Sequence, residues 1–181
     1  MDDIVKAALK KWPNVPACCG WLGLDARGDW YLRDAAVQAA GPFPGVKGSR
    51  LQHEKLREFI GRNYEADADG AWFFQNGPQR VFVELEAAPW VLGVQRLGGE
   101  WRVHTHTGEP FGRVAEALLD EAGRLFLAGA LGLGLVRSVD MAAAADAVEQ
   151  GCWPLQEVPF ELLPARFGYR LSPMADLPER P

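Results

Sequence analysis

The chain has 181 residues, of which 48% are hydrophobic and 24% are charged, and its formal net charge is −5. This composition is typical of a globular protein with a buried core and excludes a disordered chain. The acidic balance argues against a nucleic-acid-binding protein, which normally presents a basic surface. No apolar run approaches the roughly 20 residues of a membrane-spanning helix, and the acidic start lacks a signal-peptide layout.

The cysteines indicate a reducing compartment. Cys18, Cys19 and Cys152 do not form an even set, and adjacent cysteines seldom bridge each other because a vicinal disulfide strains the backbone. Three reduced thiols are typical of cytosolic proteins. We therefore expect a cytoplasmic protein with neither a nucleic acid nor a membrane as its partner.

The first elements are a helix and a hairpin. Residues 4–12 place their apolar side chains on one helical face, and Pro13 ends that helix. Two apolar segments, 21–24 and 30–32, flank a turn that ends in Gly28, which predicts a β-hairpin.

The stretch around which the chain is organised spans residues 49–90. Apolar side chains recur at a 3.6-residue period over 51–64, which predicts a helix, and Ser49 and Gln52 have the spacing of a capping box. Residues 71–74 and 80–87 are predicted strands. The second strand alternates, so we expect Glu84 and Glu86 on a solvent-exposed face.

One turn pattern recurs three times. Asp25, Asp67 and Asp120 each precede a glycine by three residues, and a large apolar residue begins a strand two residues after that glycine. The spacing between the copies is uneven, which excludes a solenoid repeat. Repeated turn chemistry of this kind predicts a mostly antiparallel sheet.

The second half of the chain contains further strands and one helix. We predict strands at 91–97 and 101–105, a hairpin at 114–119 and 125–127, a strand or tight loop at 131–139, an alanine-rich helix from Asp140 to Gln150, and an extended proline-rich tail with a short helix near 160–163. The fold class is therefore α+β, with antiparallel hairpins packed by the central and alanine-rich helices. We expect two small lobes, residues 1–95 and 96–181.

The order of these motifs resembles that of an uncharacterised bacterial family, DUF1285. The resemblance rests on Gly28 with Trp30, on the turn from Asp67 to Trp72, and on the strand from Val81 to Glu84 followed by Ala88-Pro89-Trp90. It covers about residues 20–95. It implies a two-lobed α+β protein and implies no activity.

The loop before the central helix is a candidate anion site. Lys47, Gly48, Ser49 and Arg50 place two cations near a predicted helix N-terminus, where free N–H groups and the helix dipole favour an anion. The loop is not a P-loop, because Lys47 is followed by Gly48 and not by Ser or Thr. A solvated capping loop is the structural alternative.

Two further candidates are an aromatic face and a histidine pair. If Trp72, Phe74 and Phe82 line an uncovered sheet face, that face is a ligand or partner surface. His104 and His106 share one face of a predicted strand, as a metal or general-base pair requires, although no third ligand is evident nearby. A polar exposed strand face is the alternative.

These features favour a non-enzymatic cytosolic module that binds a small anionic molecule or another protein, and a homodimer is a further option. The alternative is a small metal-dependent hydrolase that uses His104 and His106 with a carboxylate such as Glu84 or Glu109. The sequence identifies no cofactor, and it contains no nucleophile elbow, Cys-x-x-Cys or dinucleotide fingerprint.

Overall fold

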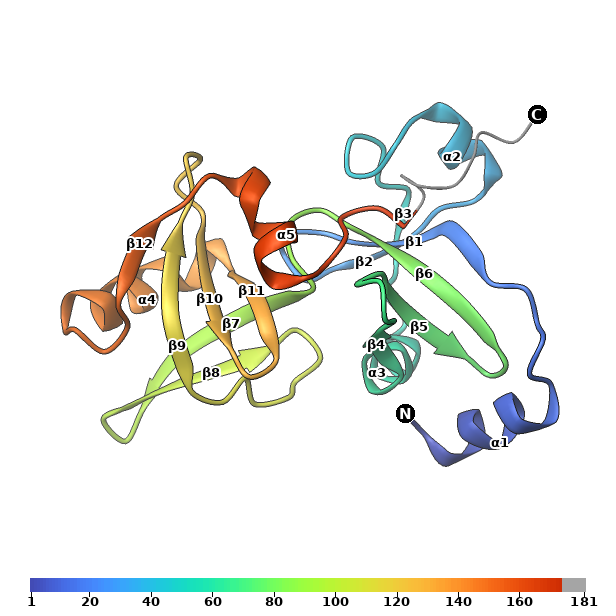
Figure 1. Ribbon diagram of the computed structural model, residues 1–181, viewed down its shortest axis with the longest axis horizontal. Coiled ribbons are helices and arrows are strands. Elements are labelled where there is room, and N and C mark those ends of the chain that lie inside the picture. Colours follow the sequence, from blue (N-terminus) through green and yellow to red (C-terminus); the bar gives the residue numbers. More distant parts are fainter. Residues whose placement is uncertain (174–181) are drawn as a thin grey trace. The chain divides into compact units, whose positions relative to one another are not determined.

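The structure is a computed structural model and describes residues 1–173. Its contacts divide the chain into two units (Figure 1). Unit 1 comprises Met1–Asp25, Asp29–Glu86 and the segment that begins at Gly168, whereas unit 2 comprises Ala26–Gly28 and Ala87–Phe167. The boundary differs from the expected one at residue 95 because the strand that starts at Trp90 pairs with strands of unit 2.

Unit 1 contains one mixed sheet and three helices within the described residues. The helices are α1 (Asp3–Lys11), α2 (Ala35–Ala40) and α3 (Glu54–Arg62). The strands are β1 (Cys18–Leu24), β2 (Trp30–Leu32), β3 (Ser49–Arg50), β4 (Tyr64–Ala66), β5 (Trp72–Asn76) and β6 (Gln79–Leu85). Their order in the sheet is β3-β2-β1-β6-β5-β4, in which β1 and β6 run parallel and the other pairs run antiparallel.

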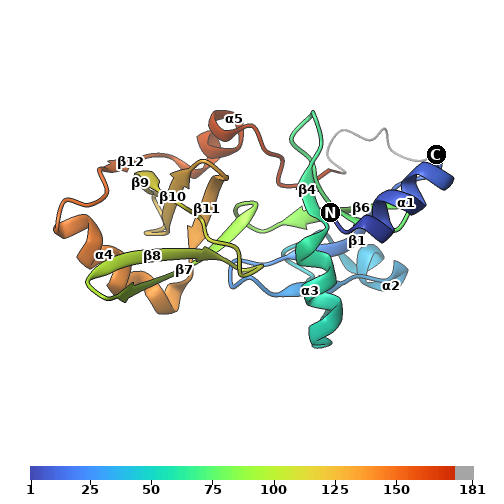
Figure 2. The ribbon, with the colours of Figure 1, turned by 90° about the horizontal axis from the view of Figure 1, so that it is seen from below.

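The core of unit 1 lies between this sheet and α3 (Figure 2). Strand alternation points Leu22 and Val83, which are paired across β1 and β6, to the same face, and both side chains are buried. Helix α3 adds the buried Ile60 and packs the ring of Phe59 edge-on against Phe74 at a centroid distance of 5.5 Å. These apolar contacts hold the helix on the sheet.

The central helix starts later than predicted. Ser49 and Arg50 form β3 by pairing with β2, so Ser49 is not a helix cap. The N-cap is His53, whose Nδ1 accepts the backbone N–H of Leu56 at 3.3 Å. Tyr64 belongs to β4 rather than to the helix. The predicted bounds of 51–64 were wrong at both ends because strand pairing takes up the flanking residues.

Unit 2 contains the second mixed sheet. Its strands are β7 (Trp90–Leu97), β8 (Glu100–Thr105), β9 (Val114–Leu119), β10 (Leu125–Gly129), β11 (Gly132–Val136) and β12 (Leu155–Glu157). Its helical segments are η1 (Ser138–Asp140), α4 (Met141–Glu149), η2 (Phe160–Leu162) and α5 (Leu163–Phe167). The strand order is β12-β9-β10-β11-β7-β8, with parallel pairing of β7 with β11 and of β9 with β12. Helix α4 packs against β7 (Figure 2).

The predicted α+β class and the predicted hairpins are confirmed, and three parallel strand pairs are added to them. The proline-rich segment after Gly151 is more regular than expected, since it forms β12, η2 and α5. The rest of the predicted tail, from residue 174, lies outside the described residues. None of the helices within residues 1–173 is long and apolar enough to cross a membrane.

The three recurring turns share one hydrogen-bond pattern. The aspartate Oδ1 of Asp25, Asp67 and Asp120 accepts the backbone N–H four residues later, at 3.0, 2.9 and 2.8 Å. The backbone N–H of each aspartate donates to the carbonyl of that same residue, at 3.0, 2.9 and 3.1 Å. A short carboxylate side chain and a glycine with positive φ thus close each turn.

Candidate functional site

The two cations of the predicted anion loop both face carboxylates. Lys47 Nζ lies 2.7 Å from Glu86 Oε2 and 3.1 Å from Asp25 Oδ2, and Arg50 Nη2 lies 2.7 Å from Asp29 Oδ1. Burial lowers the pKa of Lys47, but its hydrogen bonds to the two carboxylates outweigh this and raise the pKa above its ordinary value. Anion binding at this loop stays a prediction, and the ion pairs weigh against it.

The predicted aromatic residues do not share one face. Phe73 of β5 pairs with Phe82 of β6, and their rings lie 5.8 Å apart, which puts Phe82 on the opposite side of the sheet from Trp72 and Phe74. Trp72 packs on Tyr64 at 4.7 Å. Phe74 lines the groove described below, whereas Phe82 lines a different and smaller pocket of about 220 Å³.

The predicted histidine pair lacks a third ligand. His104 lies in β8 with its ring over Gly93, whereas His106 follows that strand and accepts the Val91 N–H at Nδ1, 3.2 Å away. Among residues 1–173, no three His, Cys, Asp or Glu side chains converge as a metal site requires. The hydrolase alternative therefore gains no support from geometry.

Unit 1 carries an apolar groove of about 700 Å³. Its floor is formed by buried side chains of β1, α3 and β5, namely Leu22, Ile60 and Phe74. Three large apolar side chains at its rim stay exposed: Trp21 at 48%, Leu32 at 46% and Leu56 at 36%. A mostly apolar concavity of this size with a few polar groups is the usual form of a small-molecule site.

A smaller pocket, of about 250 Å³, contains two buried charged side chains. Arg33 is 4% exposed and Glu84 is 5% exposed, and both line this space together with Phe43. The expectation that Glu84 lies on a solvent-exposed face was wrong. The loop that follows α2 covers this side of the sheet, with Phe43 Cε2 only 2.6 Å from where a side chain on Gly23 would begin.

The environment of Glu84 raises the pKa of its carboxyl group. Burial has the largest effect, while a hydrogen bond from Ser172 and the charge of Arg33 act in the opposite direction. The folded protein therefore holds this proton more tightly than the unfolded chain does.

The free energy of unfolding is expected to fall as the pH rises from the ordinary glutamate value of 4.5 through the raised pKa of Glu84. In that pH window the folded state binds more protons than the unfolded state. Above it, the contribution of Glu84 to the free energy of unfolding stays constant at its lower value. The difference between wild type and Glu84→Gln in urea unfolding across a pH series isolates this contribution. A difference that does not change with pH would contradict the expectation.

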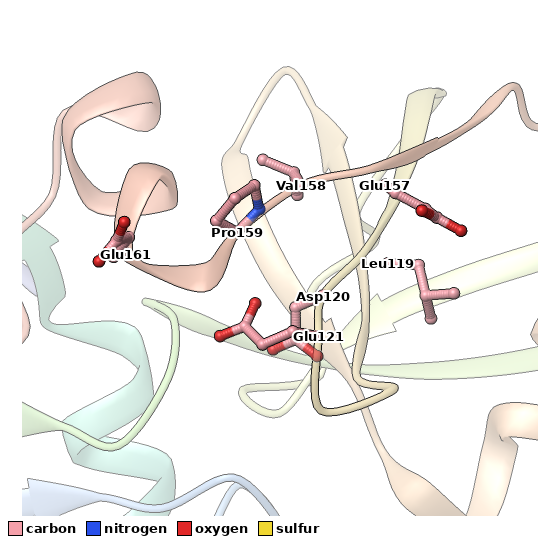
Figure 3. Close-up of a pocket in the computed structure, with 7 residues that line it drawn as sticks. All are labelled: Leu119, Asp120, Glu121, Glu157, Val158, Pro159 and Glu161. Carbon is pink, nitrogen blue, oxygen red and sulfur yellow. The ribbon is translucent and has the colours of Figure 1, made fainter.

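Unit 2 has an acidic pocket of about 600 Å³ between the β9–β10 turn and the segment after β12 (Figure 3). Two of its carboxylates serve the local fold. Asp120 closes its turn and binds Arg124 Nε at 2.6 Å, and Glu121 Oε2 accepts the N–H of Phe160 at 2.9 Å. This pocket is therefore a weaker candidate than the groove of unit 1 and the pocket that Arg33 and Glu84 line.

The sequence patterns did not identify most residues of the groove or of the pocket that Arg33 and Glu84 line. The sequence patterns singled out neither Trp21 nor Arg33. The available signal was the polar pair Arg33-Asp34 directly after a short strand, where Asp34 caps α2 by accepting the Val37 N–H at 2.9 Å.

Comparisons with known proteins identify related chains of unknown function. A family model described as "Protein of unknown function (DUF2946)" matches residues 1–174. The structure is similar to a solved DUF1285 family protein from Shewanella baltica OS155, with 17% identity, a TM-score of 0.48, and coverage of 70% of this chain and 91% of that one. No curated protein matched the chain.

Proposed function

The chain belongs to the family of proteins of unknown function DUF2946, and from this premise we propose that unit 1 is a non-enzymatic binding module whose groove takes an amphipathic small molecule. The observation that carries the proposal is the groove of about 700 Å³ with Trp21, Leu32 and Leu56 exposed at its rim. Water at these side chains is displaced when an apolar ligand binds.

The chemistry of the lining supports an amphipathic ligand. The floor is apolar, whereas Arg33, Asp34, Asn76 and Gln79 contribute polar groups to the same groove. A ligand with an apolar body and a polar group matches both parts of this surface. We propose cytoplasmic action because the three thiols suit a reducing compartment.

The first test uses the fluorescent amphipathic anion 1-anilinonaphthalene-8-sulfonate as the probe. We expect saturable binding to the wild type and an affinity about 5- to 30-fold lower in Trp21→Thr, since losing the contact of one rim side chain costs roughly 1–2 kcal/mol. Fluorescence titration measures both affinities.

Trp12→Thr is the matched control. Trp12 is 50% exposed, nearly the same as Trp21, belongs to the same unit and does not line the groove. Its substitution should leave the affinity unchanged. Equal losses in the two variants, or no loss in Trp21→Thr, would contradict the assignment of the groove as the binding site.

A further inference from the structure

The pocket between Arg33 and Glu84 has open hydrogen-bonding capacity on both charged groups. The Oε1 atom of Glu84 is buried and has no hydrogen-bond partner within the described residues. A buried carboxylate oxygen without a partner is costly, so native structures normally satisfy it. The Glu84 side chain lines the pocket, so a ligand that enters it with a hydrogen-bond donor can supply the missing partner.

Arg33 supplies donors to the same space. Its Nε donates to Val46 O at 3.2 Å, Nη1 donates to Gly20 O at 3.3 Å, and Nη2 donates to Gly41 O at 2.6 Å. A guanidinium has five N–H groups, so two of them have no acceptor among residues 1–173. These backbone contacts fix the guanidinium in place before any ligand arrives, which lowers the entropic cost of binding.

The two groups influence each other electrostatically, yet no hydrogen bond or ion pair joins them in the described part of the chain. A cation and an anion therefore face a shared cavity whose combined charge is close to zero. A ligand that carries one anionic and one cationic group can place its anion against Arg33 and its cation against Glu84. A simple anion would meet the carboxylate, and a simple cation would meet the guanidinium.

The remaining lining sets the size and character of the ligand. The Phe43 ring lies 5.9 Å from the Arg33 guanidinium carbon and forms an apolar wall. Gln38 adds an amide whose Nε2 already donates to the Arg33 carbonyl at 3.0 Å. A volume of about 250 Å³ admits a molecule of a few heavy atoms with a short apolar group.

We propose that the pocket lined by Arg33, Glu84, Gln38 and Phe43 is a binding site for a small zwitterion, a compound with a carboxylate and an ammonium group such as a short-chain α-amino acid. The carboxylate binds the two remaining N–H groups of Arg33. The ammonium donates to Glu84 Oε1. This site is separate from the proposed groove, and Arg33 lines both.

The test is isothermal titration calorimetry of the full chain with L-alanine, with propionate and ethylamine as probes that each carry one of its two charged groups. We expect saturable L-alanine binding with a Kd in or below the millimolar range and at least about tenfold weaker binding of each single-charge probe. Absence of L-alanine binding, or equal binding of propionate, would overturn the proposal. These measurements need no variant, so they hold even if substitutions disturb folding.

Variants then locate the site. Glu84→Gln keeps the shape and removes the charge, and it should weaken L-alanine binding by at least about tenfold. Glu86→Gln is the control, because Glu86 lies two residues along the same segment, pairs with Lys47 and does not line the pocket. Equal affinities in Glu84→Gln and wild type would overturn the assignment. Trp21→Thr should retain L-alanine binding, which separates this site from the groove.

Discussion

Gly70→Ala should destabilise unit 1 by about 3–4 kcal/mol. Gly70 has a φ of +79°, which costs a side-chain-bearing residue free energy. A Cβ at this position would also overlap Gly168 O and lie 3.0 Å from Gly168 C and 3.1 Å from Tyr169 Cα. These are backbone atoms and cannot rotate away. Urea unfolding gives the size of the loss, and hydrogen exchange of peptides from each unit assigns it to unit 1.

Gly123→Ala is the matched control for this substitution. Gly123 ends the same kind of turn with a φ of +73°, and apart from its chain neighbours no atom of residues 1–173 lies within 4 Å of its would-be Cβ. Its substitution should cost only the backbone strain, about 1 kcal/mol, in unit 2. The difference in the free energy of unfolding between the two variants measures the cost of the overlap with the backbone at Gly168. Equal effects would show that this overlap contributes nothing.

Arg33→Leu should cost about 3–5 kcal/mol of stability in unit 1. The substitution leaves the carbonyls that Arg33 binds without their donor and leaves the buried Glu84 without its opposing charge. Unpaired buried polar groups are among the few causes of large single-residue effects. Urea unfolding of the wild type and the variant measures the loss.

Two comparisons identify the cause of that loss. Arg50→Leu removes an exposed arginine that forms an ion pair with Asp29, so its effect should be much smaller. The double variant Arg33→Leu/Glu84→Gln should be less destabilised than the sum of the two single variants, because the neutral amide no longer needs a cation. Strict additivity would show that Arg33 stabilises unit 1 through the backbone carbonyls of Gly20, Gly41 and Val46 alone.

Local patterns predicted the elements well where neighbouring residues decide the structure. The three Asp-to-Gly turns are closed by their own side chains, and alternation correctly predicted the strand that holds Val83. The parallel pairs were not predictable in this way. The pairing of Leu22 with Val83 joins residues about sixty positions apart, and no local pattern encodes that register.

The candidate sites were harder to predict for the same reason. Alternation assigns Glu84 to a face of its strand but does not tell which loop covers that face, so its burial beneath the segment around Phe43 was missed. Exposure of Trp21 depends on which elements pack beside it, and in the folded chain it lies at the rim of a groove. Tertiary packing decides both properties, and single-strand periodicity carries no information about it.

The return of the chain to unit 1 has a consequence for synthesis on the ribosome. Leu171 O accepts the Leu85 N–H at 2.7 Å, and the Arg170 N–H donates to Gly70 O at 3.0 Å, so the first unit includes contacts made by residues translated after the whole of unit 2. Unit 1 therefore cannot be completed during translation before unit 2 has emerged. Until then unit 1 is incompletely packed and part of its apolar surface stays exposed. We therefore expect nascent chains stalled near Phe167 to be substrates for chaperones and proteases.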